Sequence, residues 1–136
     1  MDRETGQVNV RRLVVIQDVG KAINPLIVEG QLMGGAVQGL GWALYEDLRY
    51  DADGQPITGS LVDYALPGVD QAPPVFETVL VEVPSDHGPL GARGVGEPPI
   101  VPTAAAVANA IFDATGVRLR DLPMTAPKVL AALQAK

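Results

Sequence analysis

Apolar and polar residues alternate along two stretches of the chain, and this alternation predicts two β-strands. The first runs from Val8 to Ile16, where β-branched residues dominate, and we expect it to be buried at its far end. The second runs from Phe76 to Val83 and is expected to be half-buried. Between them, Leu48 to Tyr50 and Ile57 to Leu61 flank a turn signal at Asp51 to Gly54, which predicts a β-hairpin.

Three helices are predicted from their start and stop signals. Asn24 is a suitable N-cap and precedes a proline, so the first helix is expected from about Pro25 to about Asp47. Thr103 to Ala114 reads as a second helix capped by its threonine, and Thr125 is expected to cap a third that frays at Lys136. The element order is α+β, and we expect a mixed sheet with a long glycine-rich helix and two C-terminal helices.

The predicted long helix carries five glycines, each of which costs about 1 kcal/mol relative to alanine in a helix interior. The first stripe of glycines holds Gly30, Gly34 and Gly41, and an adjacent one holds Gly35 and Gly39. Small residues on one face let the helix backbone lie close to a neighbouring element or a bulky ligand.

Gln31 and Gln38 project from about the same face of this helix. Amide side chains both donate and accept hydrogen bonds, so two of them beside small residues can read the edge of a polar heterocycle. The alternative is that the glycines serve helix packing and the glutamines are surface residues. The pattern alone favours this structural interpretation.

The stretch from Gly88 to Pro99, GPLGARGVGEPP, combines glycines and prolines with one arginine, Arg93, and one carboxylate, Glu97. Glycine lets a main chain approach a ligand closely, whereas proline fixes φ and removes a donor, so the loop has a defined shape. A stiff loop that presents bare N–H groups beside a single glutamate suits a catalytic base with a backbone cradle. The alternative is a tight connection between a strand and a helix.

The composition indicates one globular domain. The chain has 136 residues, 47% of them hydrophobic and 19% charged, which is enough for a core of its own. Only 4% are aromatic, so we expect a core of Val, Leu, Ile and Ala with Trp42 as its one large anchor. The net charge of −6 argues against a nucleic-acid partner, and no apolar run approaches the ~18 residues of a membrane span.

The residue inventory excludes several chemistries. Without cysteine the chain provides no disulfide, thiolate zinc site, cysteine nucleophile or cysteine-ligated iron–sulfur cluster. His87 is the only histidine and is expected in a loop, which leaves no histidine-based metal site on this chain alone. The glycines from Gly91 to Gly96 are in the wrong order for a dinucleotide fingerprint. Any redox centre must therefore come from a bound cofactor or another subunit.

Several short motifs follow one another in a characteristic order. They are Asp18-Val19-Gly20, Asn24-Pro25, Gly30-Gln31, Gly34-Gly35, Gln38-Gly39-Leu40-Gly41, Ala43-Leu44, Glu46, Tyr64, Pro67, Gly91-Ala92-Arg93-Gly94-Val95-Gly96-Glu97-Pro98-Pro99, Ala108-Asn109-Ala110 and Thr115-Gly116-Val117-Arg118. Their joint order closely resembles the C-terminal part of the molybdopterin-binding (large) subunit of the xanthine dehydrogenase/aldehyde oxidase family, the molybdenum hydroxylases. The resemblance covers nearly the whole chain, from Val8 to Leu133.

The resemblance implies roles for particular residues. In the family, the glutamate of the G-x-G-E motif is the general base that takes a proton from a hydroxyl ligand of molybdenum, and Glu97 occupies that position. Gln31 matches a glutamine that hydrogen-bonds the pterin, and Gln38 is a less specific match. The backbone of Arg93, Gly94, Val95 and Gly96 is expected to approach the molybdenum end of the cofactor, with Arg93 as a cationic side chain near it.

The resemblance also implies cofactors and partners. These are molybdenum-molybdopterin, in mononucleotide or cytosine dinucleotide form, with iron–sulfur clusters and usually FAD on partner chains. Because a family subunit is several times longer, residues 1–136 are expected to form a single partial molybdopterin-binding domain that is inactive alone. Its expected partners are the remainder of the subunit, an iron–sulfur subunit and usually an FAD subunit. The substrate is expected to be an aldehyde or N-heterocycle. The location is expected to be cytoplasmic, or periplasmic through a partner's export signal.

Two alternatives stay open at this point. The chain can be a non-catalytic remnant or assembly module that keeps the fold without a complete site. It can also be an unrelated acidic α+β ligand-binding domain, which requires the joint match of motifs to be chance.

Overall fold

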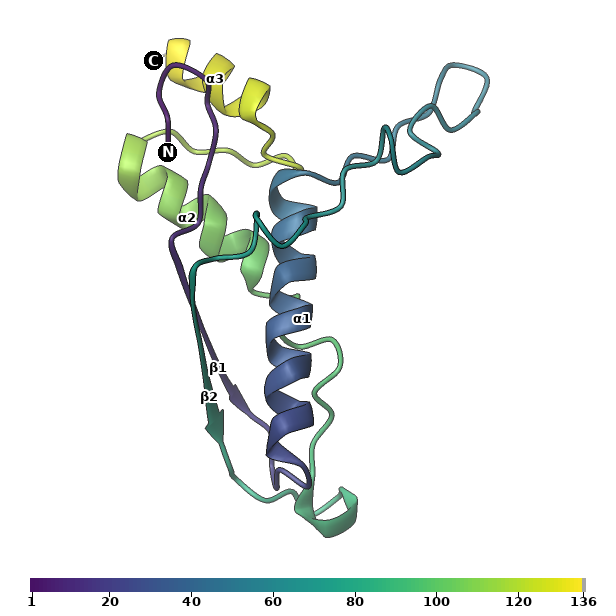
Figure 1. Cartoon of the computed structure of the whole chain (residues 1–136), viewed down its shortest axis with the longest axis vertical. Helices are drawn as coiled ribbons and strands as arrows, with labels where there is room; N and C mark the ends of the chain where they lie inside the picture. Colours follow the sequence, from purple (N-terminus) through teal and green to yellow (C-terminus); the bar gives the residue numbers. More distant parts are fainter. Residues whose placement is uncertain (136) are drawn as a thin grey trace.

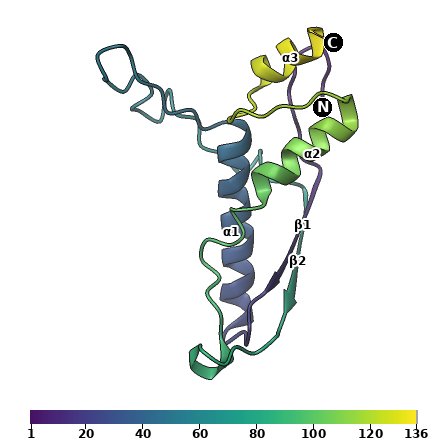
Figure 2. The same cartoon turned by 180° about the vertical axis from the view of Figure 1, so that it is seen from behind.

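The computed structural model describes residues 1–135, with one long helix between a two-stranded sheet and an extended loop (Figure 1). The elements in chain order are β1 (Arg12–Asp18), α1 (Pro25–Leu44), β2 (Val75–Val81), the short 3-10 helix η1 (Pro89–Gly91), α2 (Thr103–Thr115) and α3 (Ala126–Gln134). Seen from behind, the loop that follows η1 runs along α1 and leads into α2 (Figure 2). The predicted α+β order is confirmed, while the fraying expected at Lys136 lies outside the described residues.

The sheet consists of β1 and β2 alone in the part of the chain that the structure describes, and the two strands are parallel. Arg12 pairs with Val75 at one end and Asp18 with Val81 at the other. The prediction of a mixed sheet is therefore wrong. Side chains alternate between partly buried and exposed along both strands, so the far end of β1 is not buried as expected, and Ile16 is 66% exposed.

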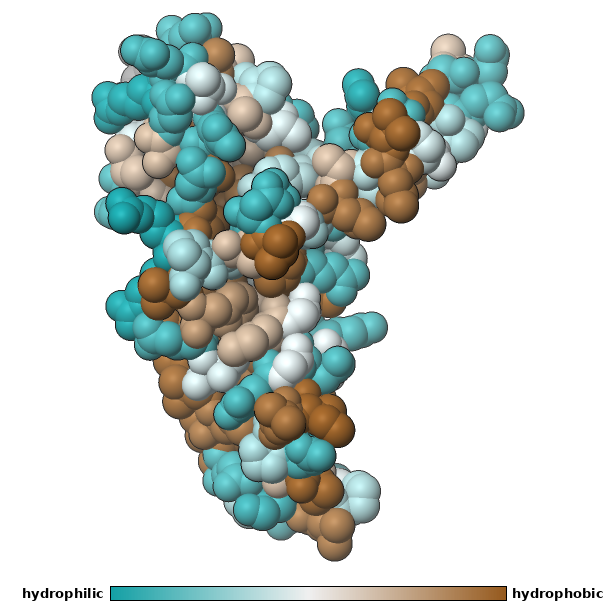
Figure 3. Space-filling view, viewed as in Figure 1, coloured by the Kyte–Doolittle hydropathy of each residue, from teal (hydrophilic) through white to brown (hydrophobic). Residues whose placement is uncertain are grey.

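The predicted β-hairpin is also wrong, although its turn is present. Asp51 and Gly54 form the turn through hydrogen bonds, but only one isolated bridge, between Tyr50 and Pro56, follows from it. A hairpin needs an apolar face packed against another layer, whereas here Leu61 is 76% exposed. Residues 46–74 instead form an arm that projects from the C-terminal end of α1 (Figures 1 and 3). Within the base of the arm, the Tyr64 hydroxyl donates a hydrogen bond of 2.5 Å to the Glu46 carboxylate, and the N–H of Glu46 donates to the Gly41 carbonyl of α1 at 2.9 Å.

Two apolar clusters hold the body together. One lies near the start of α1 and contains Val19, Ala22, Val28 and Leu32. The other joins the end of α1 to α2 and α3, and it consists of Leu40, Ala43, Leu44, Val107, Ile111, Met124 and Val129. Trp42 belongs to neither and is 47% exposed, so the prediction that it anchors the core is wrong.

The helix ends follow their local signals only in part: Thr125 occupies the N-cap position of α3 as predicted, but its side chain makes no capping hydrogen bond. Asn24 caps α1 as predicted, because its side-chain oxygen accepts a hydrogen bond of 3.3 Å from the N–H of Ile27. α1 stops at Leu44, three residues before its expected end. Thr103 does not cap α2: its hydroxyl instead donates to the carbonyl oxygen of Pro99 at 2.9 Å, which fastens the loop to the first turn of the helix.

The second glycine stripe of α1 lies against the loop that precedes α2. A Cβ at Gly35 would lie 3.1 Å from Cβ of Pro99, and a Cβ at Gly39 only 2.6 Å from Cβ of Thr103. Nothing lies within 4 Å of a Cβ at Gly30 or Gly34. Close packing of the α1 backbone, predicted from the glycines, therefore holds for Gly35, Gly39 and Gly41, which lies against Glu46 and Pro67, but not for Gly30 and Gly34.

Two carboxylates tie the carboxyl ends of the strands to the turn that leads into α1. Asp18 accepts hydrogen bonds from the N–H groups of Gly20 at 3.0 Å and Val83 at 3.1 Å. Glu82 accepts from the N–H of Ala22 at 2.7 Å and pairs with the Lys21 ammonium at 3.1 Å. These backbone donors stabilise the charged forms, so the pKa values of both carboxyls lie below their usual range, with smaller contributions from Arg93 and Lys21.

Substituting Gly39 tests the close contact between α1 and the loop. Gly39→Ala is expected to destabilise the fold by about 1–3 kcal/mol, because the added methyl collides with the buried Thr103. Gly34→Ala on the same helix is the matched control and is expected to stabilise by about 0.5–1 kcal/mol through helix propensity. Urea unfolding of both variants measures the difference, and equal effects would contradict the packing described.

Acid is expected to destabilise the fold through Asp18 and Glu82. Because their folded-state pKa values are lowered, the unfolded chain binds protons more readily in acid. The two carboxylates contribute fully to the free energy of unfolding at pH values above the ordinary carboxyl pKa. This contribution is lost as the pH falls below about 4 toward their lowered folded-state pKa values.

Urea unfolding across this pH range measures the effect. The double variant Asp18→Asn/Glu82→Gln should lose stability less steeply than the parent, whereas Asp113→Asn, an exposed carboxylate on α2, should follow the parent. A double variant as steep as the parent would show that other groups govern the acid transition.

Candidate functional site

The glycine-proline loop begins with a tight turn at η1. Leu90 has a φ of 55° and Gly91 a φ of 77°, so two consecutive residues adopt left-handed backbone angles. The Gly91 carbonyl then accepts hydrogen bonds from the N–H groups of Lys21, at 2.8 Å, and Ser85, at 3.0 Å. The turn therefore joins the start of the loop to the segments that follow both strands.

The loop pairs with the β1–α1 connection through one isolated antiparallel bridge, between Gly20 and Ala92. Gly20 has a φ of 64°, and a Cβ at this position would collide with the Gly91 carbonyl oxygen. Glycine is therefore required at position 20 by both its backbone angle and the close approach of the loop.

Arg93 is anchored on both its main chain and its side chain. Its N–H donates to the Val19 carbonyl at 3.0 Å. Its Nε donates to the Val83 carbonyl at 3.3 Å and lies 3.1 Å from Oδ2 of Asp18. The positive charge of Arg93 is thus paired with Asp18 within the chain.

After Arg93 the loop presents free backbone donors. Within residues 1–135, the N–H groups of Gly94, Val95, Gly96 and Glu97 donate no hydrogen bond to the protein. Nothing lies within 4 Å of a Cβ at Gly94 or Gly96, so space is open beside both. Val95 differs from its neighbours because its side chain packs against the apolar cluster at the start of α1. The loop is therefore held from one side and open on the other.

Glu97 lies at the exposed end of this open stretch. Its carbonyl oxygen accepts from the N–H of Ile100 at 2.9 Å, which forms the turn into the buried Pro99. Its carboxylate forms no hydrogen bond or ion pair with residues 1–135. The side chain is therefore free to contact a ligand.

Gln31 and Gln38 both lie exposed on α1, beside the glycine that contacts the loop. Gln31 is one helical turn before Gly35 and Gln38 is three residues after it, so all three share a helix face. The carbonyl oxygen of Gly96 lies 3.6 Å from the position of a Cβ at Gly35. The structure thus brings the glutamines and the loop to one side of α1, although no hydrogen bond joins them.

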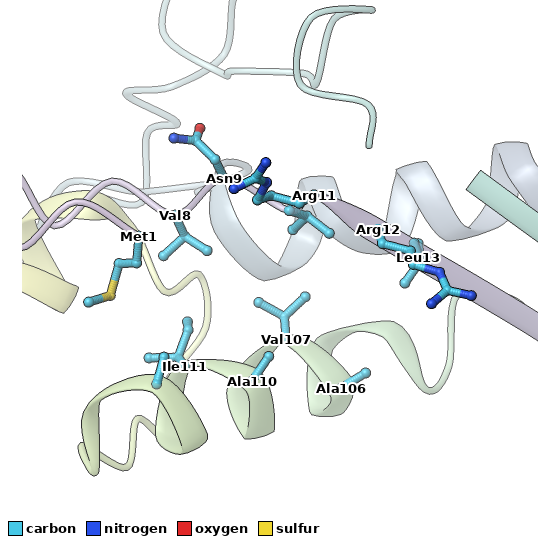
Figure 4. Close-up of a pocket in the computed structure, with 12 residues that line it drawn as sticks. Met1, Val8, Asn9, Arg11, Arg12, Leu13, Ala106, Val107, Ala110 and Ile111 are labelled. Atoms are coloured by element: carbon cyan, nitrogen blue, oxygen red, sulfur yellow. The ribbon is translucent and has the colours of Figure 1, made fainter. Parts of the chain in front are cut away.

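An apolar groove lies elsewhere. It runs between the N-terminal segment and α2, where Val8 and Leu13 face Val107 and Ile111 (Figure 4). Asn9, Arg11 and Arg12 also line it, and it contains none of the predicted site residues.

The described residues contain no cluster of three or more His, Cys, Asp or Glu side chains arranged to hold a metal ion. None of the helices in residues 1–135 is long and apolar enough to cross a membrane. His87 lies in the exposed loop before η1, as predicted.

The sequence did not identify Asp18 as part of the site. Its position directly after a β-branched run and before Val19-Gly20 is typical of a side chain that accepts a hydrogen bond from the N–H two residues later. That signal predicts the bond to Gly20 but not the contacts to Val83 and Arg93, which are 65 and 75 positions away.

Comparison with known proteins identifies the family. The model of the molybdopterin cofactor-binding domain matches residues 1–73, which include Gln31 and Gln38 but not the loop with Glu97. The gamma subunit of the 6-hydroxypseudooxynicotine dehydrogenase complex of Paenarthrobacter nicotinovorans is 42% identical over 136 residues, covering 98% of this chain and 17% of the relative. The xanthine dehydrogenase molybdenum-binding subunit of Escherichia coli O157:H7 is 40% identical over 125 residues, covering 91% and 16%.

A solved structure agrees with these sequence relatives. The aldehyde oxidoreductase from Desulfovibrio gigas superposes with a TM-score of 0.88 at 41% identity, covering 98% of this chain and 14% of that one. The chain spans 14–17% of the length of these relatives. The match excludes an unrelated ligand-binding domain and confirms the resemblance inferred from the motifs: the chain belongs to the molybdopterin cofactor-binding family and corresponds to part of the large subunit of a molybdenum hydroxylase of the xanthine dehydrogenase/aldehyde oxidase type.

Proposed function

We propose that this chain supplies the base glutamate, Glu97, and part of the molybdopterin site of a molybdenum hydroxylase, and that it is inactive alone. The observation that carries the proposal is the stretch from Gly94 to Glu97, whose N–H groups have no protein partner and whose glycines leave open space. Consecutive free N–H groups suit an electron-rich oxygen or anionic ligand, since each can donate one hydrogen bond to it.

The residues fit the cofactor that the family binds. Molybdenum-molybdopterin, when bound, supplies the redox and oxygen-transfer chemistry that no side chain of this cysteine-free chain provides. Gln31 and Gln38 lie on the same side of α1 as the loop, and their amides match the donors and acceptors of a pterin edge. Arg93 holds the loop through Asp18 and adds a cationic group near the proposed site.

Glu97 would act as the general base. Its carboxylate is free of protein partners and sits at the end of the row of free N–H groups. Enclosure between the cofactor and the rest of the subunit would exclude water from this carboxylate and leave it facing the reacting group. In that enclosed site, an oxygen of the carboxylate would accept the proton released during hydroxylation of the substrate.

The relatives indicate the classes of substrate and partner. Their names include a xanthine dehydrogenase subunit, an aldehyde oxidoreductase and a subunit of a dehydrogenase complex for a nicotine derivative. We propose an aldehyde or an electron-poor N-heterocycle as substrate. The remainder of the subunit, an iron–sulfur subunit and usually an FAD subunit are the proposed partners, with the assembly in the cytoplasm or, through a partner's export signal, in the periplasm.

Replacing Glu97 tests the base assignment. The chain is co-expressed with candidate partners, the remainder of the subunit and a small cysteine-rich iron–sulfur subunit, and molybdenum is measured in the purified complex. Glu97→Gln is expected to lower turnover by about 10²–10⁴-fold with molybdenum content unchanged, because it removes the base without removing side-chain volume. Glu4→Gln, an exposed glutamate in the N-terminal turn, is the matched control and should keep full turnover.

A complex with stoichiometric molybdenum whose Glu97→Gln variant keeps full activity would overturn the base assignment. A complex that assembles without molybdenum would instead favour the alternative function, a non-catalytic assembly module. The two outcomes are separated by the metal analysis.

A further inference from the structure

Asp18 sits where β1, β2 and the glycine-proline loop meet. Oδ1 accepts hydrogen bonds from Gly20, in the β1–α1 connection, and from Val83, just after β2. Oδ2 lies 3.1 Å from Nε of Arg93 at the start of the open loop. One carboxylate therefore joins three segments that are distant in the sequence.

Arg93 is the last firmly held residue before the free N–H groups. Its main-chain N–H donates to Val19, its Nε donates to the carbonyl of Val83, and the same Nε forms an ion pair with Oδ2 of Asp18. These three contacts together hold both the backbone and the side chain of residue 93.

Beyond Arg93 few contacts hold the loop. Val95 contributes one apolar contact, the Glu97 carbonyl accepts from Ile100, and Pro99 is buried against Gly35. Glu97 therefore lies between the ion pair at Arg93 and the packed Pro99. Without the ion pair, the open stretch would be restrained only by the main-chain bond of Arg93, the apolar contact of Val95 and the packing of Pro99.

We propose that the Asp18–Arg93 pair is a latch that fixes the direction in which the loop presents Glu97, and that Asp18 is a positioning residue for the site. The role of Glu97 as a base rests on the proposed function, whereas the latch itself rests only on the contacts of this chain.

The absence of cysteine makes a direct test of the latch practical. Glu97→Cys and Asp113→Cys introduce two unique thiols, one at the loop and one on the exposed face of α2, for spin labels. Pulsed dipolar spectroscopy on the full chain then measures the distribution of distances between the labels. The parent is expected to give one narrow peak, and Asp18→Asn, Asp18→Ala and Arg93→Gln are expected to lose it in favour of a broad distribution.

Two further variants separate a latch from general stability. Glu77→Gln breaks the more exposed ion pair of Arg12 with Glu77, at 2.8 Å, which joins β1 to β2 but lies at the opposite end of the sheet. It should keep the narrow peak. Arg93→Lys retains the charge that faces Asp18 and should restore most of the narrow peak that Arg93→Gln loses.

Amide exchange gives an independent measure on the unlabelled chain. In Asp18→Asn, exchange of the Arg93 and Lys21 N–H groups should accelerate by about tenfold, because loss of a charge-assisted hydrogen bond opens the Gly20–Ala92 bridge more often. Exchange in the second half of α1 should not change.

A narrow peak in both Asp18→Asn and Arg93→Gln would overturn the latch, as would equal broadening in Glu77→Gln. If Asp18→Ala fails to fold, Asp18→Asn and Arg93→Gln still test the latch. Both variants are expected to fold, because each keeps a polar side chain at an exposed position. Full activity of Glu97→Gln in the assembled complex would overturn the proposed function and leave the result on the latch intact.

Discussion

The close contact between α1 and the loop from Gly96 to Thr103 is the constraint on which the rest of the structure depends. At Gly35 and Gly39 the helix has no side chain, and Pro99 and Thr103 occupy the space that one would fill. The helix also buries Leu32 and Leu40 completely or nearly so, each worth about 1.5–3 kcal/mol. The loop therefore packs directly against the backbone of a helix that is itself held by buried side chains.

Apolar packing and polar contacts have different roles in forming the site. The apolar clusters and the glycine contacts fix where α1 and the loop lie relative to each other. The exposed ion pair of Asp18 and Arg93 adds little stability, because solvent screens it, but it restricts the direction of the chain after Arg93. The result is a short stretch of backbone, from Gly94 to Glu97, whose N–H groups are free. Val95 packs it against the apolar cluster, and open space beside the glycines leaves room for a cofactor.

The elements predicted correctly are those whose signals are local. Asn24 caps α1, Gly116 ends α2 with a left-handed angle, and β2 follows its apolar alternation, since each depends on a few neighbouring residues. The hairpin and the mixed sheet were wrong because strands need partners that local alternation does not reveal. Trp42 was misplaced because hydrophobicity alone does not say which face of a helix meets the core.

The candidate site was predicted in parts. Glu97 and Gln31 were predicted from the joint order of the motifs. In the structure, the loop that carries Glu97 packs against the same face of α1 that carries Gln31. Asp18 was missed because its partners Val83 and Arg93 are brought to it only by the parallel pairing of β1 with β2 and the return of the loop. Contacts across such sequence distances depend on the tertiary fold and leave no local pattern.

The most direct test of the account is a crystal structure of the assembled molybdenum-containing subunit. The account predicts that the N–H groups from Gly94 to Glu97 and the Glu97 carboxylate face the cofactor, with Gln31 in hydrogen-bond contact with the pterin and the Asp18–Arg93 pair intact. A cofactor bound away from this loop, with Glu97 in solvent, would contradict it.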